Sequence, residues 1–259
     1  MVTTKKIFHY FCIMNRLVFL FISFIYCCNL YSQILINEYS AANFDSYTDN
    51  YGEYEDWIEL YNTSNTDVDL NGWYLSDKIN NPTKWIFPSS FIVPANSTAI
   101  IYCSGRDELN GGFAHPNFKI TQTRGNETIM LTDNANNLQD SITVKPNQNT
   151  HSRGRETDGS LAWKVFTTAT PNGANVGAME EYASTPVFSQ IGGYNSASVN
   201  LDLSSPDLNV SIYYTTNGDE PNNGSNLYTS GTPINISNTS VVKAIAYSSD
   251  PNIPPSFIE

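Results

Sequence analysis

After residue 33, short segments of alternating hydrophobic and polar residues recur, and no window keeps a 3.6-residue period. These segments are rich in β-branched and aromatic residues and lie between clusters of Asn, Gly, Pro and Ser, a pattern typical of strands joined by turns. The chain is therefore predicted to be all-β. The predicted strands cover residues 34–39, 56–62, 72–76, 83–87, 97–103, 117–121, 127–132, 140–144, 162–165, 187–190, 198–203, 210–215, 227–228, 234–236 and 241–247.

The strand pattern divides the chain into two units. Strands recur about every ten residues in the first unit, which is typical of a β-sandwich. We place this unit at residues 33–176, a linker with little β pattern at 177–185 and a second, smaller sandwich at 186–249. Residues 250–259 are expected to form a Pro-rich tail or a stiff linker to a further domain, ending in an apolar stretch without a visible partner.

The first 32 residues have the composition of a secretory signal peptide. They contain three basic residues, no acidic residue and an apolar run at residues 17–26. That run is shorter than the roughly 20 residues that a membrane-spanning helix needs. We expect cleavage after Ser32, a mature chain without a membrane span and a secreted, extracellular or cell-surface location, with an uncleaved N-terminal anchor as the alternative.

Charge and cysteine content narrow the functions further. The chain has 13 Lys and Arg against 25 Asp and Glu, for a net charge of −12. Removing the leader with Lys5, Lys6 and Arg16 leaves ten basic residues and a net charge of −15. Such acidity argues against nucleic acid as a partner. Only Cys103 lies outside the leader, so the mature chain has no intramolecular disulfide, and we expect this thiol to be buried.

The landmarks of the first unit follow a specific order along the chain. They are INEY at residue 36, DWIELYN at 56, DLNGWYLSD at 69, KWIFP at 84, ETIMLTD at 127, SRGR at 152, DGSLAW at 158 and TPNGAN at 170. Together they closely resemble the lamin-tail domain, an immunoglobulin-like sandwich found on nuclear lamins and on many secreted bacterial proteins. The resemblance covers about residues 34–175.

The second unit has landmarks of its own, namely PVFSQIGG at residue 186, IYYTTNGDEP at 212 and VVKAIAY at 241. These resemble the small sandwich at the C-terminus of chitobiase and β-hexosaminidase enzymes, over about residues 186–248. The resemblance implies an immunoglobulin- or fibronectin-like accessory domain without catalytic residues.

An acidic segment is the first candidate site. Seven acids and no Lys or Arg fall within residues 38–59. Calcium prefers such carboxylate and carbonyl oxygens, so a calcium site is one hypothesis for the loop at 45–55, with a solvated acidic loop as the favoured alternative. The candidate ligands are Asp45, Asp49, Glu53 and Glu55. No other cofactor is expected.

The strand-end acids Glu38, Asp56, Glu59 and Asp77 are expected to be fold determinants. Asp56 is predicted to accept hydrogen bonds from turn amides, and Glu38 or Glu59 to pair with Arg153 or Arg155 in the SRGR segment, which is predicted to be a loop. A glycosidase-like pair of carboxylates is the sharper alternative. No catalytic residue is predicted.

Aromatic residues suggest a glycan site. The four tryptophans lie in the landmarks of the first sandwich and are expected to be core residues. Tyr213, Tyr214 and Tyr228 of the second unit are the candidate sugar contacts. Alternation places Tyr213 and Tyr214 on opposite faces of their strand, so at most one of the two packs inward.

The sequence thus predicts a secreted, non-catalytic modular protein that acts in binding, adhesion or spacing. Its partner is an unknown extracellular protein or polysaccharide. One alternative is the N-terminal accessory region of a larger secreted enzyme, such as a spore-coat-type kinase-like protein, a nuclease or a glycoside hydrolase. Another alternative is a glycan-binding module.

Overall fold

The computed structural model describes residues 32–123, 125 and 127–259. The predicted signal peptide lies outside these residues, except for Ser32. The regular elements of the described residues are all strands, which confirms the all-β prediction. No helix in this part of the chain is long and apolar enough to cross a membrane.

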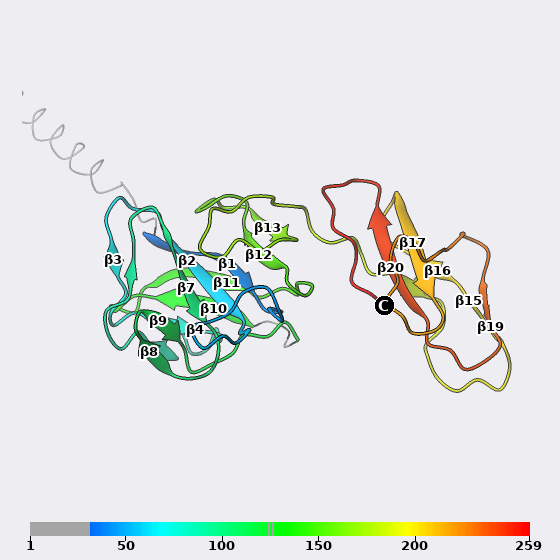
Figure 1. Ribbon diagram of the computed structural model, residues 1–259, viewed down its shortest axis with the longest axis horizontal. Helices are drawn as coiled ribbons and strands as arrows, with labels where there is room; N and C mark the ends of the chain where they lie inside the picture. The colour runs from blue at the N-terminus through cyan, green and yellow to red at the C-terminus, as the bar shows by residue number, and fades with distance from the viewer. Residues whose placement is uncertain (1–31, 124, 126) are drawn as a thin grey trace, which may run out of the picture.

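The first domain contains strands β1 to β13. They are β1 (Ile34–Ser40), β2 (Trp57–Asn62), β3 (Val68–Asp69), β4 (Tyr74–Ser76), β5 (Trp85–Ile86), β6 (Ile92–Val93), β7 (Thr98–Tyr102), β8 (Glu108–Asn110), β9 (Phe113–His115), β10 (Thr128–Thr132), β11 (Leu138–Thr143), β12 (Ser152–Arg155) and β13 (Trp163–Phe166). A seven-stranded sheet has the order β13-β12-β1-β2-β7-β9-β8, and a four-stranded sheet has the order β11-β10-β4-β5 (Figure 1). The pairs are antiparallel apart from β7 with β9.

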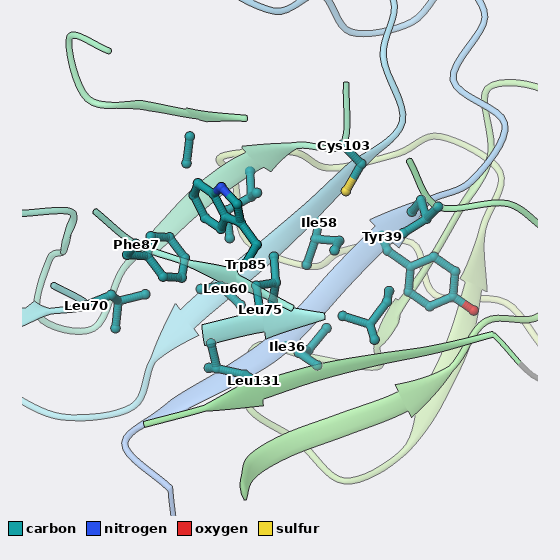
Figure 2. Close-up of a cluster of buried hydrophobic side chains, with 14 of the residues drawn as sticks. Ile36, Tyr39, Ile58, Leu60, Leu70, Leu75, Trp85, Phe87, Cys103 and Leu131 are labelled. Carbon is teal, nitrogen blue, oxygen red and sulfur yellow. The ribbon is translucent and has the colours of Figure 1, made fainter. Parts of the chain in front are cut away.

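The main core lies between these two sheets. Ile36 of β1, together with Ile58 and Leu60 of β2, faces Leu75 and Leu131 of the smaller sheet, and all five are fully buried (Figure 2). Side chains on one face of a strand recur every second residue, which explains why Ile58 and Leu60 share this face while their neighbours point outward.

A bulge in β1 changes the alternation of that strand. The register with β2 shifts between Ile36 and Glu38, so one extra residue, Asn37, lies between them. Ile36 and Tyr39 therefore both reach the core although they are three residues apart, and Glu38 points to the opposite face. Every residue of β1 except Leu35 is buried, on the outer face of the sheet as well as in the core.

The tryptophans and Cys103 are buried largely as the sequence predicts. Trp85 and Cys103 belong to the main core, and Trp73 and Trp163 are partly buried against it. Trp57 is fully buried, but in a second cluster with Ile100 and Tyr102. Trp57 and Tyr102 are register partners and so share a face, and their neighbours Ile58 and Ile101 face the main core, so this second cluster lies on the outer face of the larger sheet.

Two local predictions in the first domain are wrong. Residues 117–121 form no strand, although Phe118 and Ile120 are buried in the core; their alternation reflects burial without a hydrogen-bonded partner strand. The SRGR segment, predicted to be a loop, is strand β12 between β13 and β1. The glycine in this segment serves close packing and does not mark a loop. A Cβ at Gly154 would lie 3.0 Å from Glu38 Cγ, so the packing there requires glycine.

The second domain contains β14 (Val187–Phe188), β15 (Val199–Leu201), β16 (Leu203–Ser204), β17 (Val210–Thr215), β18 (Asn226–Leu227), β19 (Ile234–Ile236) and β20 (Lys243–Ser248). They form the pairs β14-β16 and β15-β19 and a three-stranded sheet with the order β18-β17-β20 (Figure 1). The buried core of this domain is small and consists of Leu201, Leu203, Ile212, Ala244 and Ala246.

The C-terminal residues pack against both the linker and the second domain. Ser256 N donates to Ala246 O (2.9 Å) and Glu259 N to Ala244 O (3.0 Å), so the segment runs beside β20. The ring of Phe257 lies edge-on to Tyr182 of the linker, with centroids 5.0 Å apart. The linker thus supplies the apolar partner that the sequence did not reveal.

Candidate functional site

Two acids predicted to be fold determinants lie side by side on the outer face of the larger sheet. Glu38 of β1 and Glu59 of β2 are register partners, and both are fully buried. Residues directly opposed on neighbouring strands have Cβ atoms about 4.5–5.5 Å apart. The segment at residues 158–175 provides much of their hydrogen bonding, and together these groups form what we call the carboxyl network.

Glu38 accepts hydrogen bonds from two other elements. The Ser152 hydroxyl of β12 donates to its Oε1, and Thr170 donates through its backbone N to Oε1 (2.9 Å) and through its hydroxyl to Oε2 (2.8 Å). This one side chain therefore fixes the Thr170 region to β1 and to β12.

Glu59 fixes the same segment two residues further along. Its Oε2 accepts from Asn172 N (2.8 Å), and its Oε1 accepts from Asn37 Nδ2 (2.9 Å). Asn37, the bulge residue, also donates to Asp158 Oδ1 (3.0 Å) and accepts from Gly159 N (3.1 Å). The bulge of β1 thus places the side-chain amide of Asn37 where both ends of the segment at residues 158–175 meet the larger sheet.

Burial dominates the electrostatics of the carboxyl network. Desolvation raises the pKa of Glu59 to about 8, and the negative charges of Glu38 and Asp158 add to this, against the hydrogen bonds from Asn37 and Asn172. Desolvation likewise raises the pKa of Glu38, although Ser152 and Thr170 stabilise its ionised form. Burial therefore favours the neutral form of Glu59 over its ionised form.

The carboxyl network suits a structural role. A carboxyl pair that hydrolyses glycosides has to reach the scissile bond. Neither Glu38 nor Glu59 is exposed, and each of their four oxygens has a hydrogen-bond partner within the domain. What the arrangement achieves is to anchor the segment at 158–175 to the sheet.

The SRGR arginines brace carboxylates, as expected, but the predicted pairing with Glu38 or Glu59 is wrong. Arg153 forms a two-pronged ion pair with Glu181 of the linker, at 2.9 and 2.7 Å. Arg155 pairs with Asp140 of β11 (2.8 Å) and donates through Nε to Ile36 O. The alternation along β12 directs these arginines to the face opposite Glu38, so they connect other parts of the chain.

The structure separates the four candidate calcium ligands. Asp45 is exposed, whereas Asp49 is buried and its Oδ1 accepts from the backbone N of Tyr51 and of Glu53. Glu53 forms an ion pair with Arg106 (2.6 Å) and Glu55 with Lys119 (2.7 Å). Among the residues that the structure describes, no group of three or more His, Cys, Asp or Glu is arranged to hold a metal ion.

The effect of calcium on the melting temperature tests the calcium hypothesis. Because Arg106 and Lys119 already pair with Glu53 and Glu55, we expect 5 mM calcium to change Tm by less than about 1 °C relative to magnesium. A calcium site would instead stabilise the folded state by mass action. A calcium-specific rise in Tm that disappears in Asp49→Asn would establish the site.

Asp56 and Asp77 behave as local fold determinants. Asp56 Oδ1 accepts from Asn43 N (3.1 Å), as predicted for an acid that bonds a turn amide, and burial raises its pKa to about 6. Asp77 is buried and pairs with Lys84 (2.6 Å).

The three candidate sugar contacts occupy different positions. Tyr214 and Tyr228 pack against the core of the second domain, and the Tyr228 hydroxyl donates to Asp202 (3.0 Å). Tyr213 points to the opposite face, which agrees with the predicted alternation. There its ring lies perpendicular to that of Tyr247, with centroids 5.6 Å apart.

Tyr213 belongs to an apolar group on the outer face of the sheet β18-β17-β20. Its register partners are Leu227 of β18, which is 57% exposed, and Ile245 of β20, which is buried. Tyr247 lies on the same face, two residues beyond Ile245. We call these four residues the outer aromatic face. Tyr247 could not be predicted from the sequence, because its place beside Tyr213 depends on the register of β17 with β20.

Two family models match the chain in succession. Residues 30–146 match the Lamin Tail Domain, and residues 190–254 match the Chitobiase/beta-hexosaminidase C-terminal domain. These matches confirm the predicted order of domains and the immunoglobulin-like fold class. The first match ends before β12, although β12 pairs with β1 in the same sheet. No curated protein matches the chain.

Proposed function

We propose that this chain, a lamin-tail-like sandwich followed by a chitobiase-C-terminal-like sandwich, is a secreted, non-catalytic binding protein. The first domain acts as a scaffold and spacer. The second domain presents the outer aromatic face to a polysaccharide at the cell surface or outside the cell. The signal-like composition of residues 1–32 supports this location.

The surroundings of the buried Glu, Cys and His side chains support a non-catalytic role. Glu38 and Glu59 hold the carboxyl network, and Cys103 is fully buried, which raises the pKa of its thiol well above the ordinary value. His115 is bonded to Ser104 and Asn50, and His151 to Tyr182. These groups therefore have structural partners rather than an open site around them.

The outer aromatic face is the observation that carries the binding proposal. Tyr213 and Tyr247 are only partly buried, and Leu227 beside them is mostly exposed. Tyrosine combines an apolar ring with a hydroxyl that hydrogen-bonds, which is the chemistry that a sugar ring with apolar faces and polar edges requires. Lys243 of β20 lies on the same face, two residues before Ile245, so the apolar group has a positive charge at its edge.

Retention on insoluble polysaccharides tests the proposal. We expect the double variant Tyr213→Ala, Tyr247→Ala to lose at least about tenfold in affinity for chitin, cellulose or cell-wall glycan, since truncating an aromatic residue that carries binding energy costs more than about 1 kcal/mol. Tyr194→Ala, which removes a tyrosine that is 97% exposed in the same domain, is the matched control.

The melting temperature separates binding from folding. A loss of retention with an unchanged Tm supports a contact role for the outer aromatic face. Equal retention by the wild type and the double variant on every polysaccharide that binds the protein contradicts the proposal, as does a parallel loss of retention and Tm.

A further inference from the structure

We propose that residues 179–184 and 252–259 together form an interdomain strap that holds the second domain against the first and supplies part of the second domain's stability. The linker is then a structural element rather than a flexible connection. The inference rests on hydrogen bonds and ring contacts that join four separate parts of the chain.

One half of the strap is attached to the first domain. Met179 and Val165 of β13 exchange two backbone hydrogen bonds, at 2.8 and 3.1 Å, so the linker continues the edge of the larger sheet. Two residues later, Glu181 forms the two-pronged ion pair with Arg153 of β12. Such paired bonds fix orientation as well as distance.

The two halves of the strap are attached to each other. Glu180 N donates to Asn252 O (2.8 Å), and Ala183 N donates to Pro254 O (2.9 Å). The prolines of the C-terminal segment lack an N–H group, but their carbonyl oxygens still accept, and the linker supplies the donors. The prolines that predict a stiff spacer are therefore compatible with a segment that is hydrogen-bonded along the linker.

The strap is also attached to the second domain. Ser184 donates through its backbone N and its hydroxyl to the carboxylate of Asp207, at 2.6 and 2.8 Å. Ser256 is fully buried and exchanges two hydrogen bonds with Ala246 of β20. The same short segments are therefore bonded to both domains.

Tyr182 is the centre of the strap. Its ring is stacked on His151 of the first domain, with an interplanar angle of 8°, and is met edge-on by Phe257 of the C-terminal segment. Its hydroxyl accepts from Gln148 N (3.1 Å) and lies 2.9 Å from His151 Nδ1. Only 8% of this tyrosine is exposed.

Gln148 connects the first domain directly to the C-terminal segment. Its side-chain amide donates to Pro255 O (2.9 Å) and to Ser256 O (3.0 Å). Removal of this amide leaves both carbonyl oxygens without that donor, while the backbone contacts of Gln148 within its own domain are retained. Gln148 therefore tests the connection selectively.

The second domain needs such support. Its buried core has five residues, two of its sheets are pairs of short strands, and the mature chain offers it no disulfide. Isolated two-stranded pairs are marginal in water, and a domain of roughly 70 residues buries a smaller fraction of its surface on folding than a larger domain does. Contacts with the strap add hydrogen bonds and apolar burial to β20.

Hydrogen exchange of the full chain, followed by mass spectrometry, tests the strap. We expect Gln148→Ala and Tyr182→Ala each to speed exchange of the β17 and β20 amides by about tenfold or more, because each variant favours local opening of the second domain. Gln190→Ala and Tyr194→Ala, which remove exposed residues of the second domain, are the matched controls.

Tryptophan fluorescence separates this effect from damage to the first domain, because all four tryptophans lie there. Faster exchange in β17 and β20 with an unchanged fluorescence transition for Gln148→Ala supports the strap. Wild-type exchange rates in β17 and β20 for both variants overturn it. If Tyr182→Ala fails to fold, Tyr182→Phe, which keeps the ring and removes the hydroxyl, takes its place.

Discussion

Glu38→Ala is expected to lower the free energy of unfolding of the first domain by about 3–5 kcal/mol. The substitution removes the acceptor for the Ser152 hydroxyl and for both the backbone N and the hydroxyl of Thr170. Buried donors without partners are costly, and the carboxyl network loses one of its two anchors. Urea unfolding followed by tryptophan fluorescence measures the change.

Two further variants define the origin of that loss. Glu156→Ala removes an exposed acid between β12 and the anchored segment and is expected to change stability by less than about 0.5 kcal/mol. Glu38→Gln keeps a carbonyl oxygen for Ser152 and Thr170 and should recover most of the loss. A Glu38→Ala loss below about 1 kcal/mol would show that the carboxyl network does not hold the segment.

The second large effect concerns pH. In the folded protein burial raises the pKa of Glu59 from its ordinary value of 4.5 to about 8. A carboxyl with a raised pKa contributes stability that is complete below pH 4.5 and is lost as pH rises through about 8. Between about pH 5 and 8 we expect the wild type to lose about 1.4 kcal/mol per pH unit relative to Glu59→Gln.

The comparison with Glu59→Gln separates this carboxyl from acids that do not interact with it, whereas Glu38 and Asp158 are coupled to Glu59 and belong to the measured difference. Burial raises the pKa of Asp56 to about 6, so Asp56 contributes a slope of the same sign to both proteins, which the difference between them cancels. Urea titrations at pH 5, 6, 7 and 8 give the difference directly. A constant difference across this range would mean that Glu59 is ionised in the fold and that its partners, rather than burial, set its pKa.

Several features of the fold followed from local sequence because their causes are local. Alternation in the segments at residues 57–62 and 210–215 reflects the two faces of a strand, so β2 and β17 appear where the pattern predicts. Phe118 and Ile120 alternate in the same way and are buried, yet their segment has no partner strand. An alternating pattern indicates burial. A hydrogen-bonded strand also needs a neighbouring strand, and the tertiary fold decides whether one is present.

The candidate sites depended on more distant relations. Glu38 was expected to meet an arginine of the SRGR segment, but the bulge at Asn37 turns Glu38 toward Thr170, and β12 directs Arg153 toward the linker. Tyr247 joined Tyr213 only through the register of two strands separated by more than 25 residues. Such contacts depend on which strands pair and in what register. Composition and spacing along the chain do not specify this.

The sequence by itself determined the all-β class, the division into two sandwiches, their order and the burial of the tryptophans, because turn residues, alternation and motif order are properties of short segments. Only the tertiary structure decided which partners the acids have, which tyrosines face outward and how residues 252–259 pack. Those outcomes depend on strand register, on a one-residue bulge and on the desolvation of groups far apart in the chain, and each of these is a property of the assembled molecule.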